Sequence, residues 1–237
     1  MPAGTRIRTM TTAMPTRTAI DLVKLLTWLS PAFPTGAYAY SHALEWAVEA
    51  RDVRTEGDLF AWLDEVLRHG SGRADAILLR HAHAARDLAA LAAVAKLAAA
   101  AQPARERRAE TLGQGDTFAI AAEVWGVPLL AELRASDQPI AYPVAVGALA
   151  AAQGVAADPA VLAFLHGFTA NLVSAAVRLV PLGQTAGLRV LSALEPAVQD
   201  IAEATRHATL DDLGSACFRS DIAAMRHETQ YTRLFRT

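Results

Sequence analysis

Nearly every segment of the chain repeats its apolar residues with the period of an α-helix, and almost none alternates as a β-strand does. Alanine fills many of these apolar positions, and only 6% of the 237 residues are aromatic. Alanine favours helices and lets them pack closely, whereas strands prefer branched and aromatic residues. The sequence therefore predicts an all-α protein, a compact bundle of about ten helices in a single domain.

Capping residues, prolines and glycines divide the chain into separate helices. We expect helices at 19–29, 41–50, 55–70, 73–102, 103–125, 128–135, 140–153, 159–180, 183–207 with a kink near Pro196, and 210–230. No linker long enough to separate domains occurs between them. Residues 1–18 are rich in Arg and Thr and lack a continuous apolar core, so we expect a disordered leader rather than a secretory signal.

Composition excludes several classes of protein. A formal net charge of −2 gives no electrostatic basis for binding nucleic acid, and no basic recognition helix of a transcription regulator stands out. The single cysteine, Cys217, can form neither an internal disulfide nor a structural zinc site, which favours a reducing compartment such as the cytoplasm. The apolar run "LAALAAVAKLAAAA" is short and contains Lys96, so it does not predict a membrane span.

The motifs that would indicate an enzyme are incomplete. The stretch "GQGDTF" at 113–118 lacks the third glycine and the preceding strand of a dinucleotide site, and no phosphate-binding GxxxxGK[ST] occurs. Near the C-terminus, "HETQY" resembles the zinc motif HExxH but ends in Tyr231. We therefore predict no catalytic residue, no cofactor and no tight metal site.

Histidines next to acidic residues leave one alternative open. His81 and His83 are two residues apart, so on a helix they point away from each other and cannot share an ion. His42 and Glu45 have an i, i+3 spacing, and we expect them to form a pair on the surface. The alternative hypothesis is an all-α enzyme or metal carrier that uses His42, Glu45 or His227.

The last helix carries two apolar stripes on opposite faces. At about 100° per residue, Phe218, Ile222 and Met225 share one face, which we expect to pack on the core. His227, Tyr231 and Leu234 fall on the opposite face. Either the chain bends back onto the domain after Met225, or the second stripe faces a partner, and we favour the second. The expected partner-binding residues are Arg226, His227, Glu228, Tyr231, Arg233, Leu234, Phe235 and Arg236.

A loop near the N-terminus, "SPAFPTGAYAYSH" at 30–42, is the second candidate surface. Its prolines stiffen it and Gly36 permits a tight turn. Tyr38 and Tyr40 alternate in direction if the loop is extended, so that one is buried and the other presented. The alternative is a loop that only plugs its own core. A polar strip bordering a core stripe, which includes Ser174, completes this surface, and the expected contact residues are Pro34, Gly36, Tyr38, Tyr40, Ser41, Asn171, Arg178 and Gln184.

Three stretches, "LSPAFPTGAYAYSHALE", "VRLVPLGQTAG" and "MRHETQYTRLFR", resemble the signature segments of the UreF family of urease accessory proteins, in the same order and at similar spacing. The pieces "ETLGQGDTFA" and "YPVAVGALAAAQGV" resemble the middle of the family, so the match runs from about 20 to 236. The loop has Gly36-Ala37 where a Gly-Gly pair is common.

The resemblance implies a non-enzymatic, all-α scaffold that takes part in inserting nickel into apo-urease. It also implies a complex with UreD (also called UreH) and the GTPase UreG, docking of the C-terminal tail on UreD, modulation of the UreG GTPase, and a homodimer. Nickel would travel on the GTPase, in agreement with the missing metal motif.

Overall fold

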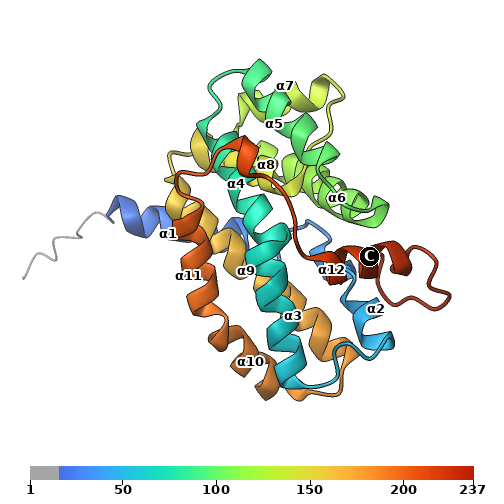
Figure 1. Ribbon diagram of the computed structural model, residues 1–237. Helices are drawn as coiled ribbons and strands as arrows, with labels where there is room; N and C mark the ends of the chain where they lie inside the picture. The colour runs from blue at the N-terminus through green and yellow to red at the C-terminus, as the bar shows by residue number, and fades with distance from the viewer. Residues whose placement is uncertain (1–15) are drawn as a thin grey trace, which may run out of the picture.

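The computed structural model describes residues 16–237, and these fold into twelve α-helices and three short 3-10 helices without any strand (Figure 1). The prediction of a compact all-α fold of about ten helices is confirmed. The leader expected at 1–18 lies outside the described residues as far as residue 15. Its last residues are helical, because the hydroxyl of Thr16 accepts from the backbone N–H of Ala19 at 3.4 Å and caps the first helix.

The elements follow one another with short connections. The α-helices are α1 (Arg17–Trp28), α2 (Leu44–Glu49), α3 (Glu56–His69), α4 (Ser71–Ala84), α5 (Leu88–Ala100), α6 (Arg105–Ala122), α7 (Pro128–Ala135), α8 (Tyr142–Ala152), α9 (Ala157–Leu179), α10 (Gly183–Ala193), α11 (Glu195–Ala204) and α12 (Phe218–His227). The 3-10 helices are η1 (Ala37–Ala39), η2 (Glu123–Trp125) and η3 (Leu210–Asp212).

The centre of the fold is α8, whose residues 143–150 are all buried. It packs mainly on α4 and α6. Small residues let these helices come close: a Cβ added at Gly147 would lie 2.4 Å from the carbonyl oxygen of Leu79, and one at Gly115 would lie 2.0 Å from that of Ile140. The alanine-rich composition therefore acts as expected, by permitting close contact between helices.

The longest helix, α9, packs against α4, α8, α10 and α11. By length and hydropathy alone it could span a membrane, but half of its most apolar stretch is buried inside the fold. Its buried side chains, which include Phe164 and Leu172, belong to the common core. Here α9 is a core helix.

Two predicted helices are wrong in their bounds. The helix expected at 73–102 is broken after Ala84, because the Asp87 carboxylate accepts from the backbone N–H of Ala90 at 2.8 Å and starts α5 anew. The helix expected at 210–230 is shorter, since Thr209 and Asp212 cap only η3. An extended connector, residues 213–217, then leads into α12.

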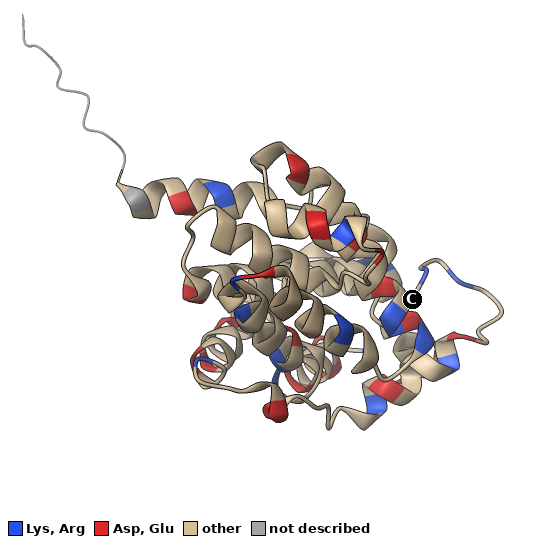
Figure 2. Cartoon of the chain, turned by 90° about the horizontal axis from the view of Figure 1, so that it is seen from above, with Lys and Arg blue, Asp and Glu red and all other residues tan. Residues whose placement is uncertain are grey.

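Figure 1 shows α12 and the C-terminal end beside α2 and α6, on the side of the molecule away from α1. Seen from above, Lys and Arg are intermixed with Asp and Glu, and several basic residues gather near the C-terminus (Figure 2). The segment that the sequence predicts to be functional thus lies at one end of the bundle.

We expect Gly115→Ala to destabilise the fold, because its methyl group would meet the backbone of Ile140 and neither α6 nor that segment can move freely. Overpacking of this kind costs about 3 kcal/mol, so the Tm should fall by roughly 6–12 °C. The matched control is Gly57→Ala in α3, where the nearest atom outside the adjacent residues is 3.8 Å away. Thermal unfolding should show Gly57→Ala unchanged or slightly stabilised. Equal Tm values for both variants would contradict the close packing of α6.

Candidate partner-binding site at the C-terminal tail

The last ten residues, 228–237, which we name the tail, fold back over the loop at 30–42. The backbone N–H of Arg236 donates to the carbonyl of Ala39 at 2.9 Å, and the N–H of Ser41 donates to that of Thr237 at 2.8 Å. The Ser41 hydroxyl donates to the same Thr237 carbonyl. The sequence left two arrangements open, and the structure shows the first of them: the chain bends back onto the domain.

His227, the last residue of α12, is completely buried between two carboxylates. Its Nδ1 lies 2.6 Å from Glu106 of α6, and its Nε2 lies 3.0 Å from Glu45 of α2. The ring therefore joins three helices, because each of its nitrogens lies within hydrogen-bond distance of a buried carboxylate on another helix.

The same two carboxylates hold the tail. Glu45 accepts from the backbone N–H groups of Leu234 at 2.7 Å and of Phe235 at 3.1 Å. Glu106 accepts from the Arg233 guanidinium at 2.7 Å. The expectation that Glu45 forms a surface pair with His42 is wrong, because both are buried and each pairs with a different helix. His42 precedes α2 in the left-handed region, with a φ of 58°, so the expected i, i+3 helical spacing does not form.

Glu110, one turn beyond Glu106, is a second anchor. It lies 3.2 Å from Nδ1 of His42 and accepts from the Thr237 hydroxyl at 2.9 Å. Burial raises the pKa of Glu110, although the positive charge of Arg107 and the hydrogen bonds from Thr237 and Gln114 oppose that rise. The end of the tail therefore rests on a carboxyl group that is removed from water.

Arg178 of α9 joins the loop to the tail. Its guanidinium carbon lies 4.5 Å from the ring centre of Tyr38 and 4.4 Å from that of Phe235, and it donates to the Tyr38 carbonyl at 3.0 Å. Asn171, two turns earlier, donates to the Ala37 carbonyl at 3.2 Å. The loop, the polar strip and the tail, which are far apart in the sequence, thus form one assembly.

The two tyrosines of the loop divide as the sequence predicts. Tyr38 is 74% exposed and Tyr40 is 8% exposed. The cause differs from the expected alternation, because residues 37–39 form the 3-10 turn η1 after Gly36, which has a φ of 71°. Gly113 provides the space for Tyr40, since a Cβ there would lie 2.8 Å from its hydroxyl.

The predicted faces of α12 are wrong. Phe218, Ile222 and Met225 are 69%, 55% and 50% exposed, while His227 is buried. The small residues Ser220, Ala223 and Ala224 form the buried face of the helix instead. Pairing with two acids places the imidazole inside, and this decides the rotation of α12 against the preference of its larger apolar residues.

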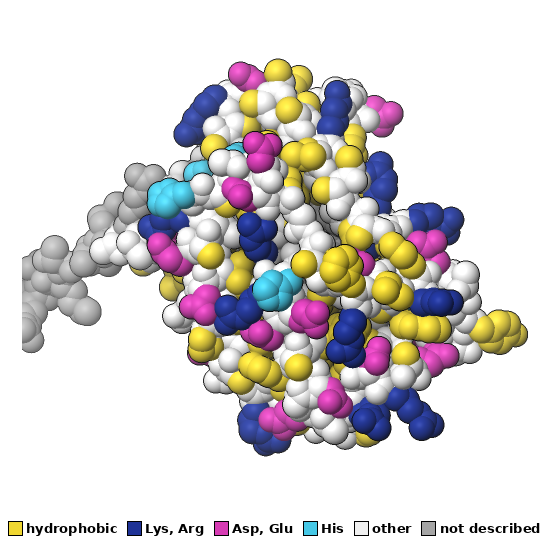
Figure 3. Space-filling model, viewed as in Figure 1, with side chains coloured by type: hydrophobic (Ala, Val, Ile, Leu, Met, Phe, Trp, Pro, Cys, Tyr) yellow, Lys and Arg dark blue, Asp and Glu magenta, His cyan; other side chains and the backbone are white. Residues whose placement is uncertain are grey.

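Some tail residues are buried against the domain, and others are exposed to solvent. Phe235 is buried, whereas Tyr231 is fully exposed and Leu234 is 77% exposed. Tyr231 and Leu234, together with the exposed side of α12, form the outer apolar face. We define this face as Phe218, Ile222, Met225, Tyr231 and Leu234. Figure 3 shows hydrophobic side chains gathered over the part of the molecule where Figure 1 places α12 and the tail.

The remaining predicted residues lie around this assembly. Arg226 and Arg236 are exposed, and the Glu228 carboxylate accepts from the backbone N–H of Arg105 at 3.2 Å. Pro34 and Gln184 are exposed and stand apart from the hydrogen bonds described above.

Sequence reasoning missed Glu106 and Glu110 on α6. The signal was present, since acids at 106 and 110 and Gln114 are spaced four residues apart and share one helix face. A polar stripe on a helix that must also pack in the core indicates buried partners.

The described residues 16–237 contain no group of three or more His, Cys, Asp or Glu side chains arranged to hold a metal ion. His81 and His83 donate to separate carbonyls, those of Ala208 and Val155, as their spacing indicates. Both nitrogens of His227 already face carboxylates. This geometry gives no support to a metal carrier built on His42, Glu45 or His227.

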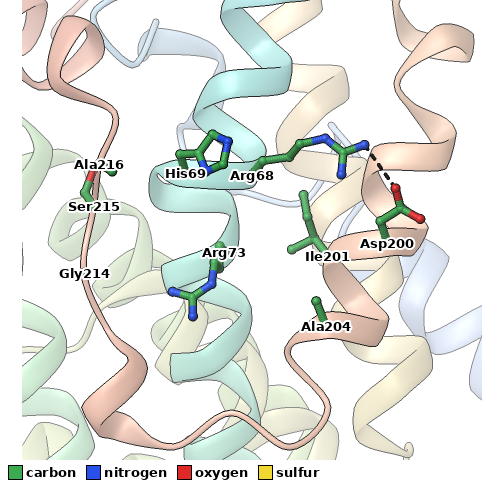
Figure 4. Close-up of a pocket in the computed structure, with 9 residues that line it drawn as sticks. All are labelled: Arg68, His69, Arg73, Asp200, Ile201, Ala204, Gly214, Ser215 and Ala216. Atoms are coloured by element: carbon green, nitrogen blue, oxygen red, sulfur yellow. Dashed lines mark hydrogen bonds and ion pairs between the residues drawn. The ribbon is translucent and has the colours of Figure 1, made fainter.

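Another depression on the described surface lies between the junction of α3 and α4, α11 and the connector at 213–217 (Figure 4). It has a volume of about 560 Å³ and is lined by Arg68, His69, Arg73, Asp200, Ile201, Ala204, Gly214, Ser215 and Ala216. Arg68 is already paired with Asp64 and Asp200. Ser215 and His69 both line this open groove, but the Ser215 hydroxyl donates to the Asp221 carboxylate at 3.1 Å and is not directed to the imidazole.

We expect His227→Ala to destabilise the protein by about 3–5 kcal/mol, because Glu45 then keeps only the backbone N–H groups of the tail as partners and Glu106 keeps only Arg233. The Tm should fall by roughly 6–20 °C. Tyr231→Ala is the matched control, because that side chain is fully exposed and its loss should change stability by less than about 0.5 kcal/mol. A His227→Ala protein with the parent Tm would show that the buried pairs do not hold the tail.

Comparison with known proteins agrees with the resemblance of the signature segments. The family model of UreF matches residues 53–195. The urease accessory protein UreF of Rhodopseudomonas palustris (strain TIE-1) is 52% identical over 231 residues, which cover 94% of this chain and 95% of the relative. UreF of Bradyrhizobium sp. (strain ORS 278) is 52% identical over 220 residues, 91% of this chain and 92% of the relative. UreF of Methylobacterium radiotolerans is 50% identical over 229 residues, 94% of this chain and all of the relative.

The signature segments that converge at the tail and the similarity along almost the whole chain lead to one assignment: the chain belongs to the UreF family of urease accessory proteins.

Proposed function

We propose that this protein is a non-catalytic adaptor in the maturation of urease, in the cytoplasm. It joins UreD and the GTPase UreG while nickel is inserted into apo-urease, modulates the UreG GTPase, and acts as a homodimer. Membership of the UreF family supports the urease role. The absence of a metal-binding group among residues 16–237 is compatible with nickel being cargo that another protein carries.

The observation that carries this proposal is the outer apolar face. Its five side chains are each at least half exposed, and they stand on a segment fixed from below by buried ion pairs. Exposed apolar groups on a rigid support are typical of protein interfaces, because they bury area on binding without losing much conformational freedom. Arg226 and Arg236 are exposed on the same segment and would supply a polar rim.

We propose that UreD and UreG bind to two separate, neighbouring surfaces. We assign the outer apolar face to UreD. We assign the neighbouring surface, formed by Tyr38 and Arg178 at the junction of loop and tail, to UreG or to the second copy in the dimer. Arg178 is exposed but stacked between two rings, so its guanidinium is held in place and needs little ordering on binding.

We expect the double variant Met225→Asp/Leu234→Asp to lose UreD, because each change places a charge in an apolar contact. Interface residues of this kind contribute about 2 kcal/mol each, about 4 kcal/mol for the two, so the affinity should fall by roughly 1,000-fold. Co-purification with tagged UreD measures the loss, and the Tm should stay within a few degrees because both side chains are exposed.

The control for that experiment is Leu188→Asp on α10, which is 65% exposed and lies outside the outer apolar face. It should retain UreD. If the double variant co-purifies with UreD as well as the parent does, the outer apolar face is not the docking surface.

We expect Arg178→Glu to weaken UreG recruitment or the dimer, because the reversed charge would face the partner and lose both ring contacts. Size-exclusion mass and a UreG pull-down with and without GTP and nickel measure the effect. Arg189→Glu is the control, since Arg189 is an exposed arginine of α10 that pairs with Glu56 away from the tail. Unchanged mass and unchanged UreG recovery for Arg178→Glu would reduce this residue to a structural contact.

A further inference from the structure

Arg107 of α6 is a buried cation with too few partners. It is 4% exposed, and its Nη1 has no hydrogen-bond partner among residues 16–237. Its Nη2 donates to the Ser220 hydroxyl over a long distance of 3.4 Å. The nearest carboxylate oxygen, on Glu110, is 3.8 Å from Nη1. A guanidinium has five donors, and leaving them unsatisfied inside a protein costs free energy. The arrangement indicates a missing acceptor.

Arg107 lines a small, partly open cavity of about 40 Å³. One wall is the beginning of α4, another the residues that lead into α6, and a third the connector before α12. The lining residues are Gly70, Ser71, Ala74, Asp75, Leu78, Ala101, Gln102, Pro103, Arg107, Leu213, Gly214, Ser215 and Asp221. A single water needs roughly 10–15 Å³, so the cavity has room for a group of three or four heavy atoms.

Two further features of the cavity favour negative charge. The helix α4 spans 14 residues and begins at Gly70 without a side-chain cap, so the positive end of its dipole faces the cavity. Asp75, on the same wall, has its pKa raised to about 8, first by removal from water and then by the charge of Glu110. When this carboxyl group carries its proton, it can donate a hydrogen bond to an anion.

We propose that this cavity binds a small planar carboxylate or oxyanion of about the size of formate. A planar anion can accept two parallel hydrogen bonds from the Arg107 guanidinium, which fills its empty donor position. Two acids line the cavity: the pKa of Asp75 is raised, and Asp221 already accepts from the Ser215 hydroxyl at 3.1 Å. Glu110 lies 3.8 Å from Nη1 of Arg107 but is not part of the lining. A cation is the wrong occupant, because it would sit beside a buried guanidinium.

The site would connect the anion to the segment that carries the tail. Ser215 and Asp221 belong to the connector and to α12, and Arg107 also neighbours Glu110, which holds Thr237. A bound anion would therefore bridge α4 and α6 to α12. The inference stands on the cavity alone and does not depend on the proposed adaptor function.

Thermal unfolding of the full chain in sodium formate tests the site. Sodium pivalate at equal ionic strength is the control, because it has the same carboxylate but is too bulky for the cavity. We expect formate, at about ten times its Kd, to raise the Tm by roughly 3–6 °C and pivalate to leave it unchanged. Equal shifts in the two salts, or none in either, would overturn the proposal and leave bound water as the acceptor for Arg107.

Two substitutions test whether the formate-dependent rise in Tm arises at this cavity. Ala74→Val fills the cavity and should abolish the formate-dependent shift while Arg107 stays in place. Ala131→Val fills a separate depression beside α7 and should leave the shift intact. Since Arg107→Gln removes a buried charge and could prevent folding, Ala74→Val is the decisive variant. A formate shift that survives in Ala74→Val would place binding elsewhere and contradict the proposal.

The pH dependence adds a second readout. Asp75, Glu110 and Asp221 are the acids that face Arg107 and the cavity, and His42 and Cys217 are the other titratable groups nearby. Loss of the Asp75 proton places a negative charge in the site, so the formate shift should shrink as pH rises through about 8. In Asp75→Asn the shift should persist at pH 9. A formate shift that does not change between pH 7 and 9 in the parent would contradict the role of Asp75.

Discussion

The buried contacts of His227 with Glu45 and Glu106 determine the shape of this end of the molecule. Carboxylates are costly to bury without partners, and these contacts form only because α2, α6 and α12 meet at one point. Once formed, they fix the rotation of α12 and leave spare carboxylate oxygens for the backbone of the tail. The position of every residue beyond 227 follows from this contact.

The rotation of α12 explains why apolar side chains remain in water. If hydrophobicity alone decided its rotation, α12 would turn its apolar stripe of Phe218, Ile222 and Met225 toward the core. Here the imidazole and small residues occupy the inner face, and the larger apolar groups stay outside. An arrangement that is unfavourable for an isolated chain becomes useful when a partner covers the exposed groups, because rigid apolar side chains bind with little loss of conformational freedom.

Close packing of small residues makes the polar assembly possible. Gly115 and Gly147 allow α6 and α4 to approach the helix α8 and the segment before it within a distance that any side chain would prevent. This holds α6 in place, so that Glu106 and Glu110 reach α12 and the tail from one side. Arg107, between them on the same helix, is carried into the interior with fewer partners than its donors require.

The sequence by itself determined the helical class, most helix ends and the absence of catalytic motifs, because these depend on local periodicity and on capping residues such as Thr55 with Asp58. It also singled out three segments as candidate contact surfaces, and it predicted that one tyrosine of the loop is exposed. It could not determine that these segments meet, that His42 and Glu45 are buried with different partners, or which face of α12 turns inward. Only the tertiary structure decided these points. The orientation of His227 is set by acids about 120 and 180 residues away in the sequence. Helical periodicity reports only on neighbouring residues, so it gives no information about such distant partners.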